Sequence, residues 1–401
     1  MRYINLFASF LLLCVTCTSE SEFKIPDSGS VLTDVLTHVL TIGGEKEIQE
    51  EFILVNPMSY CIAVNDENDI FVFDEASIKV YDENGKPKKI IGGPGEGPGE
   101  FYRSSSYSLW IGPTGYMTAF GGQHRDELNL FTPDYKFLEQ INYRQYKPYE
   151  HIFTELNISA GIPLISQPSV ALNETDRILL IEGDGIKDKF DREYYSVLIY
   201  KSGNMYKKIA HYKQSNRIIS IYSTSGTKEL GSLMAAILTN NRLVYTQTYH
   251  ETYIGEKEAK YNLFIISLDD FSKSTITRNY IPVKFTEKEF PLISKEEKDK
   301  ALIELYEKTI DVYKERKYKS PLQNILTDRN FIFAFTYEKN ESEEIFTDIF
   351  NADTEKYLSS AYFPFIPSVI KNGYAYHLKR VTATEFAEIK KYKIDPAVYG
   401  K

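Results

Sequence analysis

The stretch "NDENDIFVFDEASIKVYDENGKPKKIIG", residues 65 to 92, carries the pattern that decides the fold. A turn rich in Asn and Asp leads into the apolar run Ile70–Phe73, and a polar hairpin turn follows. A second strand then places Ile78 and Val80 at alternating positions, and the "DENG" turn at 82–85 opens a third strand. Because no helical segment separates these strands, the stretch predicts an antiparallel sheet made of consecutive hairpins.

The same order recurs five more times along the chain. The later copies are "GPTGYMTAF" with "ELNLFTPDYKFLEQI", "NETDRILLIEG" with "YYSVLIYKSGNMYKKIA", "TNNRLVYTQTY" with "YNLFIISLDD", "TDRNFIFAFTY" with "FTDIFNADTEKYLSSAYF", and "IKNGYAYHL" with "FAEIKKYKID". Six copies of a four-stranded unit predict an all-β fold, a six-bladed β-propeller. A β-sandwich also has many short strands, but it would not repeat this order. The 31 tyrosines and 24 phenylalanines favour β-structure as well.

The copies can be aligned on the aromatic or aliphatic residue that ends the second strand of this pattern. These anchors are Tyr81, Phe131, Tyr200, Ile266, Phe350 and Tyr392. Their uneven spacing predicts insertions between the repeats. One of these, about 294–320, has Ala301, Leu302 and Leu305 at helical spacing after a Ser294 N-cap. We expect a helix there, packed on the propeller or presented to a partner.

The N-terminus has the layout of a secretory signal. Arg2 precedes an apolar run, Leu6–Val15, that is too short for a permanent membrane anchor. The run ends near Cys17, and the segment resembles the signal of bacterial lipoproteins, in which such a cysteine is acylated. An ordinary cleaved signal is the alternative. The "SESE" that follows is similar to the export signal of lipoproteins on the surface of certain Gram-negative outer membranes.

These features set the expected domain boundaries and location. We expect a signal peptide at 1–16, a tether at 17–32 and the propeller at 33–401, in an outer-membrane lipoprotein on the cell surface or the periplasmic face. Removing 1–16 moves the net charge from −9 to −10 and leaves Cys61 as the one cysteine not used by the signal or the lipid. An acidic chain without a basic block is a poor candidate for nucleic acid. We expect a monomer that meets the membrane only through its lipid.

The glycine-rich segment "IIGGPGEGPGEFYR", residues 90 to 103, has two readings. A phosphate-binding loop would open a helix, but "YRSSSYSLWIG" reads as strand, so we expect a crossing from one blade to the next. There Glu100 would accept backbone N–H bonds and Phe101 would wedge between blades. Residues 91–101 resemble the I-G-x-x-G-x-G-P-G-E-F signature of NHL-like six-bladed propeller lipoproteins of Gram-negative gut-type bacteria. That resemblance implies a fold and a location, and no activity.

A search for catalytic and metal-binding motifs finds none. The six histidines lack zinc-binding spacing, no G-x-S-x-G elbow is present, and no cofactor is indicated. The elaborated loops are those between the second and third strands, at 121–127, 182–193, 247–261 and 336–346. We expect binding residues on this face, with His124, Arg125, Tyr249, His250 and Tyr253 as candidates, because aromatic rings stack on sugars and Arg pairs with carboxylates.

The sequence therefore predicts a binding module of the cell envelope, with a glycan, a peptide or another envelope protein as partner. The rival hypothesis is a propeller hydrolase or lyase with its site at the central channel. The inner strands that can be placed, "SVAL" and "LMAAIL", are mostly apolar or small, which argues against the enzyme. A purely structural role is the third possibility.

Overall fold

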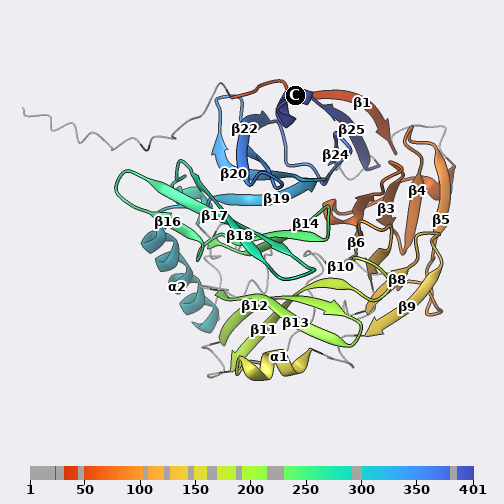
Figure 1. Ribbon diagram of the computed structural model, residues 1–401, viewed down its shortest axis with the longest axis horizontal. Helices are drawn as coiled ribbons and strands as arrows, with labels where there is room; N and C mark the ends of the chain where they lie inside the picture. Colours follow the sequence, from red (N-terminus) through yellow and green to blue (C-terminus); the bar gives the residue numbers. More distant parts are fainter. Residues whose placement is uncertain are drawn as a thin grey trace, which may run out of the picture.

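The computed structural model describes residue 23 and residues 31–43, 49–102, 107–121, 127–142, 149–159, 169–186, 192–214, 230–290, 300–379 and 386–401. Within these ranges the strands form six antiparallel sheets arranged in a ring (Figure 1). The protein is thus a six-bladed β-propeller, as the sequence predicts. We number the blades from the first complete one along the chain.

Each blade has four main strands, from the innermost to the outermost. Blade one contains β2 (Ile62–Val64), β3 (Ile70–Asp74), β4 (Ser77–Tyr81) and β5 (Pro87–Ile91). Blade two contains β6 (Ser108–Ile111), β7 (Met117–Phe120), β8 (Glu127–Phe131) and β9 (Phe137–Asn142). Blade three contains β10 (Ser169–Ala171), β11 (Arg177–Ile186), β12 (Arg192–Ser202) and β13 (Met205–Gln214).

The last three blades follow the same order with two variations. Blade four contains β14 (Leu233–Leu238), β15 (Arg242–Gln247), β17 (Ala259–Ser267) and β18 (Lys273–Asn279), and the short β16 (Thr252–Ile254) continues the line of β15 along β17. Blade five contains β19 (Leu322–Asp328), β20 (Phe331–Lys339), β21 (Ile345–Asn351) and β22 (Lys356–Phe363). Blade six contains β23 (Val369–Lys371), β24 (Tyr374–Lys379), β25 (Glu388–Ile394) and, from the start of the chain, β1 (Leu36–Ile42).

The two ends of the chain close the ring together. Strand β1 pairs antiparallel with β25, so that Leu36 lies opposite Ile394 and Ile42 opposite Ile389. The expected tether is also partly held, because the N–H of Leu32 donates to the carbonyl of Ser360 in β22 at 2.9 Å. The signal peptide and Cys17 lie outside the described residues.

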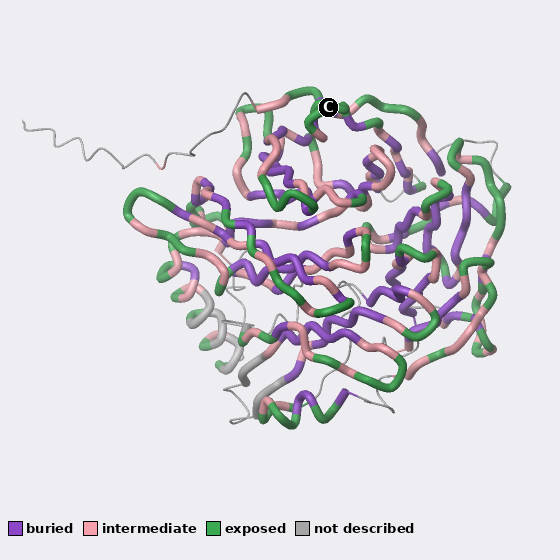
Figure 2. The backbone as a smooth tube through the Cα atoms, viewed as in Figure 1, coloured by how far each residue is buried: buried purple, intermediate pink, exposed green. Residues whose placement is uncertain are grey.

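Burial between blades explains why consecutive hairpins assemble into a ring. Six apolar clusters lie one at each joint between neighbouring blades of the described structure. In β3, Ile70 and Val72 pack toward blade six, whereas Phe71 and Phe73 pack toward blade two. A middle strand is therefore buried on both faces and reads as a continuous apolar run, while the hairpin turns and outer strands are exposed (Figure 2).

The glycine-rich segment forms the crossing from β5 to β6. Gly92 and Gly99 adopt φ angles of 70° and 77°, in the left-handed region that glycine occupies readily. Glu100 accepts the N–H of Gly97 at 2.8 Å, and the ring of Phe101 is buried within the cluster between blades one and two. The expected roles of Glu100 and Phe101 are confirmed.

The two described α-helices lie outside the ring of sheets. The expected insertion contains α2 (Lys300–Arg316), which ends before residue 320; residues 291–299, with the predicted N-cap Ser294, are outside the described ranges. The short α1 (Glu150–Glu155), which no sequence pattern predicted, lies beside blade three (Figure 1). Its Ile152 and Phe153 are buried in the cluster between blades two and three. Short 3-10 helices cover Glu50–Phe52, Ser59–Cys61, Glu287–Glu289 and Pro396–Tyr399. None of the described helices is long and apolar enough to cross a membrane.

Candidate functional site

A channel of about 610 Å³ runs through the centre of the propeller, between the innermost strands. All six blades contribute to its lining, through β2, β6, β10, β14, β19 and β23 and the turns beside them. Its volume lies within the range of about 300–1,000 Å³ that is usual for small-molecule sites. The rigid frame of six sheets surrounds it.

The wall of the channel is apolar over most of its length. Its aliphatic members include Ile111, Val170, Met234, Leu238, Ile325 and Ile370. The innermost strands have this composition because both of their faces pack against neighbouring blades. A molecule inside the channel would therefore meet mainly hydrocarbon.

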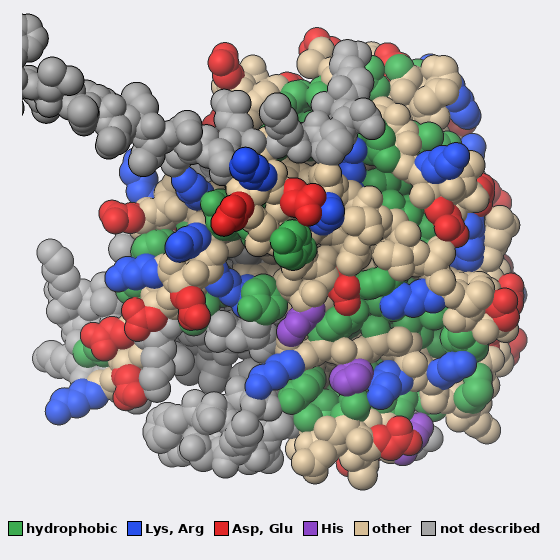
Figure 3. Space-filling model, turned by 60° about the vertical axis from the view of Figure 1, so that its left-hand side comes forward, with side chains coloured by type: hydrophobic (Ala, Val, Ile, Leu, Met, Phe, Trp, Pro, Cys, Tyr) green, Lys and Arg blue, Asp and Glu red, His purple; other side chains and the backbone are tan. Residues whose placement is uncertain are grey.

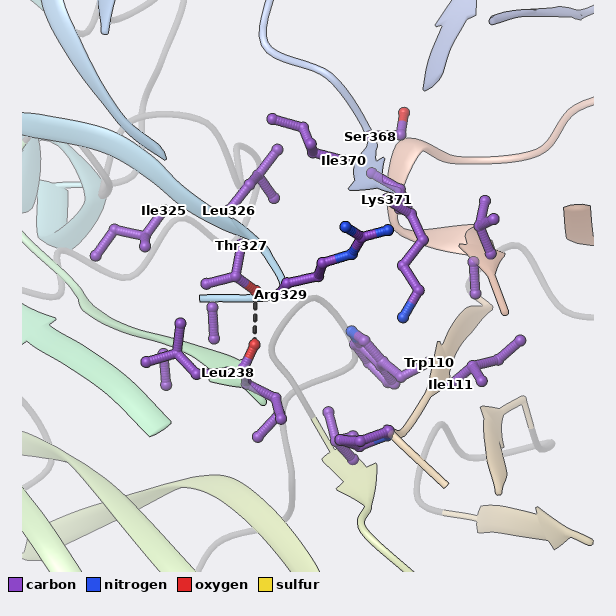
Figure 4. A pocket seen from close by; sticks show the side chains of 18 of the residues that line it. Trp110, Ile111, Leu238, Ile325, Leu326, Thr327, Arg329, Ser368, Ile370 and Lys371 are labelled. Carbon is purple, nitrogen blue, oxygen red and sulfur yellow. Dashed lines mark hydrogen bonds between the residues drawn. The ribbon is translucent and has the colours of Figure 1, made fainter. Parts of the chain in front are cut away.

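The charged side chains of the described lining lie together at one end of the channel, which we call the rim. They are Asp66, Arg329 and Lys371, and they stand at or beside the turns that join the first and second strands of blades one, five and six. The Nζ of Lys371 lies 2.5 Å from Oδ1 of Asp66. Figure 4 shows Arg329, Lys371 and the indole of Trp110 around one common space.

A hydrogen-bonded scaffold holds the rim in place. The buried carboxylate of Asp328 accepts the backbone N–H groups of Asn372 and Gly373, both at 2.8 Å, and the hydroxyl of Tyr399 at 2.9 Å. Burial and the charge of Asp328 raise the pKa of Tyr399, so its hydroxyl stays protonated and donates. Asp328 of blade five thus holds the turn between the first and second strands of blade six in place.

Asn372 extends the scaffold to both neighbouring blades. Its amide Nδ2 donates to the carbonyl of Asp66 at 3.2 Å and to Oδ1 of Asn68 at 3.0 Å. Its Oδ1 accepts a hydrogen bond from Nη2 of Arg329 at 3.4 Å. The three blades that carry the rim charges are therefore linked through a single amide side chain.

Two hydrogen bonds to blade four hold the turn that carries Arg329 on its other side. The N–H of Thr239 donates to the carbonyl of Arg329 at 3.3 Å, and the hydroxyl of Thr327 donates to the carbonyl of Ile237 at 2.6 Å (dashed in Figure 4). Arg329 has a φ of 56°, close to the 58° of Asn240 and the 52° of Asn372 at the matching turns of blades four and six. Asn tolerates this left-handed conformation better than Arg does.

The three described candidate residues, Tyr249, His250 and Tyr253, lie at the opposite end of blade four. Tyr249 and His250 follow β15, and their rings lie 5.1 Å apart. The guanidinium of Arg316, at the end of α2, stands 3.6 Å over the ring of Tyr249, and the ring of Tyr212 stacks on His250. Tyr253 lies further along the hairpin in β16 and is 57% exposed. The structure therefore brings Tyr249 and His250 together.

The other two candidates, His124 and Arg125, lie outside the described residues. The binding of a glycan or a peptide by this face stays a prediction. The rim residues Arg329 and Lys371 were missed, because they lie in ordinary turns of separate repeats. A usable signal existed in "TNNR", "TDRN" and "IKNG", where Arg329 takes the left-handed turn position that is Asn240 in blade four and Asn372 in blade six.

A second buried polar cluster lies between blades four and five. Asp348 accepts the hydroxyls of Tyr261 and Ser360, each at 2.8 Å, and forms an ion pair with Arg278 at 3.1 Å. Burial raises the pKa of Asp348 even so. Burial, with a smaller effect of Asp348, also raises the pKa of Glu338 to about 7.

Metal binding has little support in the described part of the chain. No group of three or more His, Cys, Asp and Glu side chains there is placed to hold a metal ion. Cys61 is buried, and its Sγ donates to the carbonyl of Tyr107 at 2.9 Å.

On the face drawn in Figure 3, basic and acidic side chains are interspersed.

Comparison with known proteins finds similarity of shape alone. No family model matches the sequence, and no curated protein does. Similar solved structures include a candidate exported protein of Bacteroides fragilis, with 11% identity and a TM-score of 0.44 over 92% of this chain and 98% of that one. A subtype N11 neuraminidase-like protein of influenza A from the flat-faced bat has 9% identity and a TM-score of 0.38, over 94% and 97%. The WD40 domain of Neurospora crassa Pan2 has 7% identity and a TM-score of 0.36, over 91% and 97%.

Proposed function

We propose that this protein is a binding module of the cell envelope that takes a small ligand into its central channel. The observation that carries the proposal is the channel itself, an apolar space of about 610 Å³ with charged and aromatic side chains at one rim. Ligand sites usually combine such apolar walls with a few polar groups that fix orientation. The linked turns of blades four, five, six and one would keep that rim in shape without a ligand.

The proposed location comes from the first residues of the chain. The apolar run before Cys17 supports export, and a lipid on Cys17 would anchor the propeller at the outer membrane. The ring closes at blade six, where Leu32 is already bound to Ser360 of the neighbouring blade. A tether from Cys17 would therefore reach the propeller beside this joint.

An enzyme in the same channel has less support. Hydrolases and lyases need a general acid and a base, or a metal, within reach of the substrate. Among the described lining residues the carboxylate is that of Asp66, and it is paired with Lys371 at the rim. Reversible binding requires no such groups, so a binding module fits the lining better.

The experiment uses N-phenyl-1-naphthylamine, a neutral apolar probe that becomes fluorescent out of water. The protein is produced without residues 1–22, which retains every residue that the structure describes. We expect saturable binding at one site. Replacing Ala236 in the channel wall by Trp fills the space and should abolish the signal, whereas Met205→Trp on an exposed hairpin should leave it unchanged.

Two results would overturn the proposal. The first is the lack of saturable fluorescence in a folded sample. The second is equal binding by the Ala236→Trp and Met205→Trp variants, because the probe would then lie outside the channel. Near-ultraviolet circular dichroism on both variants checks that each has kept its packed core.

A further inference from the structure

The charges of the channel are distributed unevenly. Of the described residues that line it, the two cations Arg329 and Lys371 and the one anion Asp66 all stand at the rim. The apolar wall beyond them offers no counter-charge. A ligand that fills this channel would thus meet hydrocarbon along its body and net positive charge at one end.

The ion pair between Lys371 and Asp66 is open to solvent. Its side chain is 26% exposed and that of Asp66 is 70% exposed, with the two charged atoms 2.5 Å apart. Ion pairs open to solvent contribute little to stability, so a second anion can replace Asp66 at little cost. Asp66 therefore acts as an exchangeable counter-ion for Lys371.

Arg329 has no carboxylate partner among the described residues. Within the described residues its side chain donates one hydrogen bond, from Nη2 to the neutral amide oxygen of Asn372 at 3.4 Å. Arg329 is exposed, and a guanidinium has five N–H donors to offer to a ligand. The arginine also holds a left-handed φ of 56°, where blades four and six have Asn. Turn formation alone does not require a cation at this position, but recognition of an anion does.

We infer that the ligand is an anionic amphiphile, with a carboxylate or phosphate head group at Arg329 and Lys371 and an apolar body inside the channel. This inference rests on the proposed function, since it names the ligand class of the same channel. The guanidinium fork binds either head group by paired N–H donors, and Lys371 adds a point charge. The indole of Trp110 covers the first carbons next to the head group.

The test measures displacement of bound N-phenyl-1-naphthylamine by four ten-carbon compounds: decanoate, decyl phosphate, decanol and decylamine. We expect the two anions to compete at least tenfold better than the alcohol and the amine. A preference between the anions identifies the head group. Equal competition by all four would overturn the inference while leaving the channel itself a binding site, whereas a probe that never binds would overturn the proposed function instead.

Three rim variants make the test specific. Arg329→Asn restores the residue type of the neighbouring turns, so it should raise thermal stability slightly while it weakens decanoate competition about tenfold. Lys371→Gln should weaken it by a similar factor. Asp66→Asn removes the competing carboxylate and should strengthen decanoate competition about threefold to tenfold.

A matched control replaces an ion pair of the same kind elsewhere. Lys339 and Glu343 form an exposed pair at 2.8 Å on the opposite side of blade five. Lys339→Gln and Glu343→Gln should leave competition by all four compounds unchanged. If Arg329→Asn and Asp66→Asn alter decanoate and decanol competition equally, the rim charges do not select the ligand and the inference is wrong.

Discussion

The ring of Phe101 lies 4.5 Å from the ring of Phe73 in blade one and 6.1 Å from that of Phe131 in blade two. A residue of the connecting segment is therefore a shared part of two blades. The glycines before it allow this approach, since a Cβ on Gly92 would lie 2.6 Å from Cε2 of Phe101. The composition of the crossing follows from the position of this ring.

Replacing Phe101 by Ala should lower the free energy of unfolding by about 3–5 kcal/mol, because it empties a buried space between two blades. Urea unfolding followed by tyrosine fluorescence measures the loss. Tyr102→Phe next to it removes only a solvent-exposed hydrogen bond to Glu96 and should change stability by less than about 0.5 kcal/mol. A loss below about 1 kcal/mol in Phe101→Ala would contradict the role of this residue as a wedge.

Gly112 of blade two lies close to the backbone of blade three. A Cβ at this position would lie 1.7 Å from the carbonyl oxygen of Ala171, which is backbone and cannot move aside cheaply. We expect Gly112→Ala to cost about 3 kcal/mol. Gly93→Ala is the matched control, since a Cβ there meets nothing within 4 Å; equal thermal midpoints for the two variants would refute the prediction.

Asp328 is expected to matter for both stability and the rim. Its replacement by Ala leaves two backbone N–H groups and the Tyr399 hydroxyl without their acceptor, which should cost about 2–4 kcal/mol. The same change should weaken probe binding, because the turn that carries Lys371 and Asn372 loses its support. Unchanged probe affinity in a destabilised variant would show that the rim keeps its shape without Asp328.

The raised pKa of Glu338 leads us to expect that stability depends on pH. Its folded-state pKa is about 7 against an ordinary value of 4.5. Between these values the unfolded chain releases its proton and the folded one keeps it, so the free energy of unfolding falls as pH rises from 4.5 to 7. With solvent screening at this half-buried group, we expect a loss of about 1 kcal/mol. Urea unfolding at pH 5 and 8 should show this loss of unfolding free energy in the natural protein and not in Glu338→Gln. An equal change between the two pH values in both proteins would contradict the assignment to Glu338.

Much of the fold follows from local pattern. Each anchor residue of the third strand pairs with the start of the second strand in its blade: Tyr81 with Ile70, Phe131 with Met117, Tyr200 with Ile178, Ile266 with Leu243, Phe350 with Ile332, and Tyr392 with Ala375. The predicted inner strands "SVAL" and "LMAAIL" are indeed β10 and β14. These features were predictable because strand alternation and turn chemistry are encoded within about thirty residues.

The rim was not predictable in the same way. Asp66, Arg329 and Lys371 meet because blades five, six and one are neighbours in the closed ring, and that adjacency appears in no local window. The small helix α1 was missed for a related reason. Its Phe153 and the preceding Tyr149 are fully buried between blades two and three, so tertiary packing and not helical periodicity defines it.

The pairing of β1 with β25 has a consequence for biosynthesis. The first blade strand to leave the ribosome waits for a partner made roughly 350 residues later. A polypeptide that stops early has five or fewer complete blades and leaves sheet edges with unpaired N–H and C=O groups. Such edges are prone to aggregation and proteolysis. The last hairpin therefore completes the ring, and chains that lack it are the ones a cell can recognise and remove.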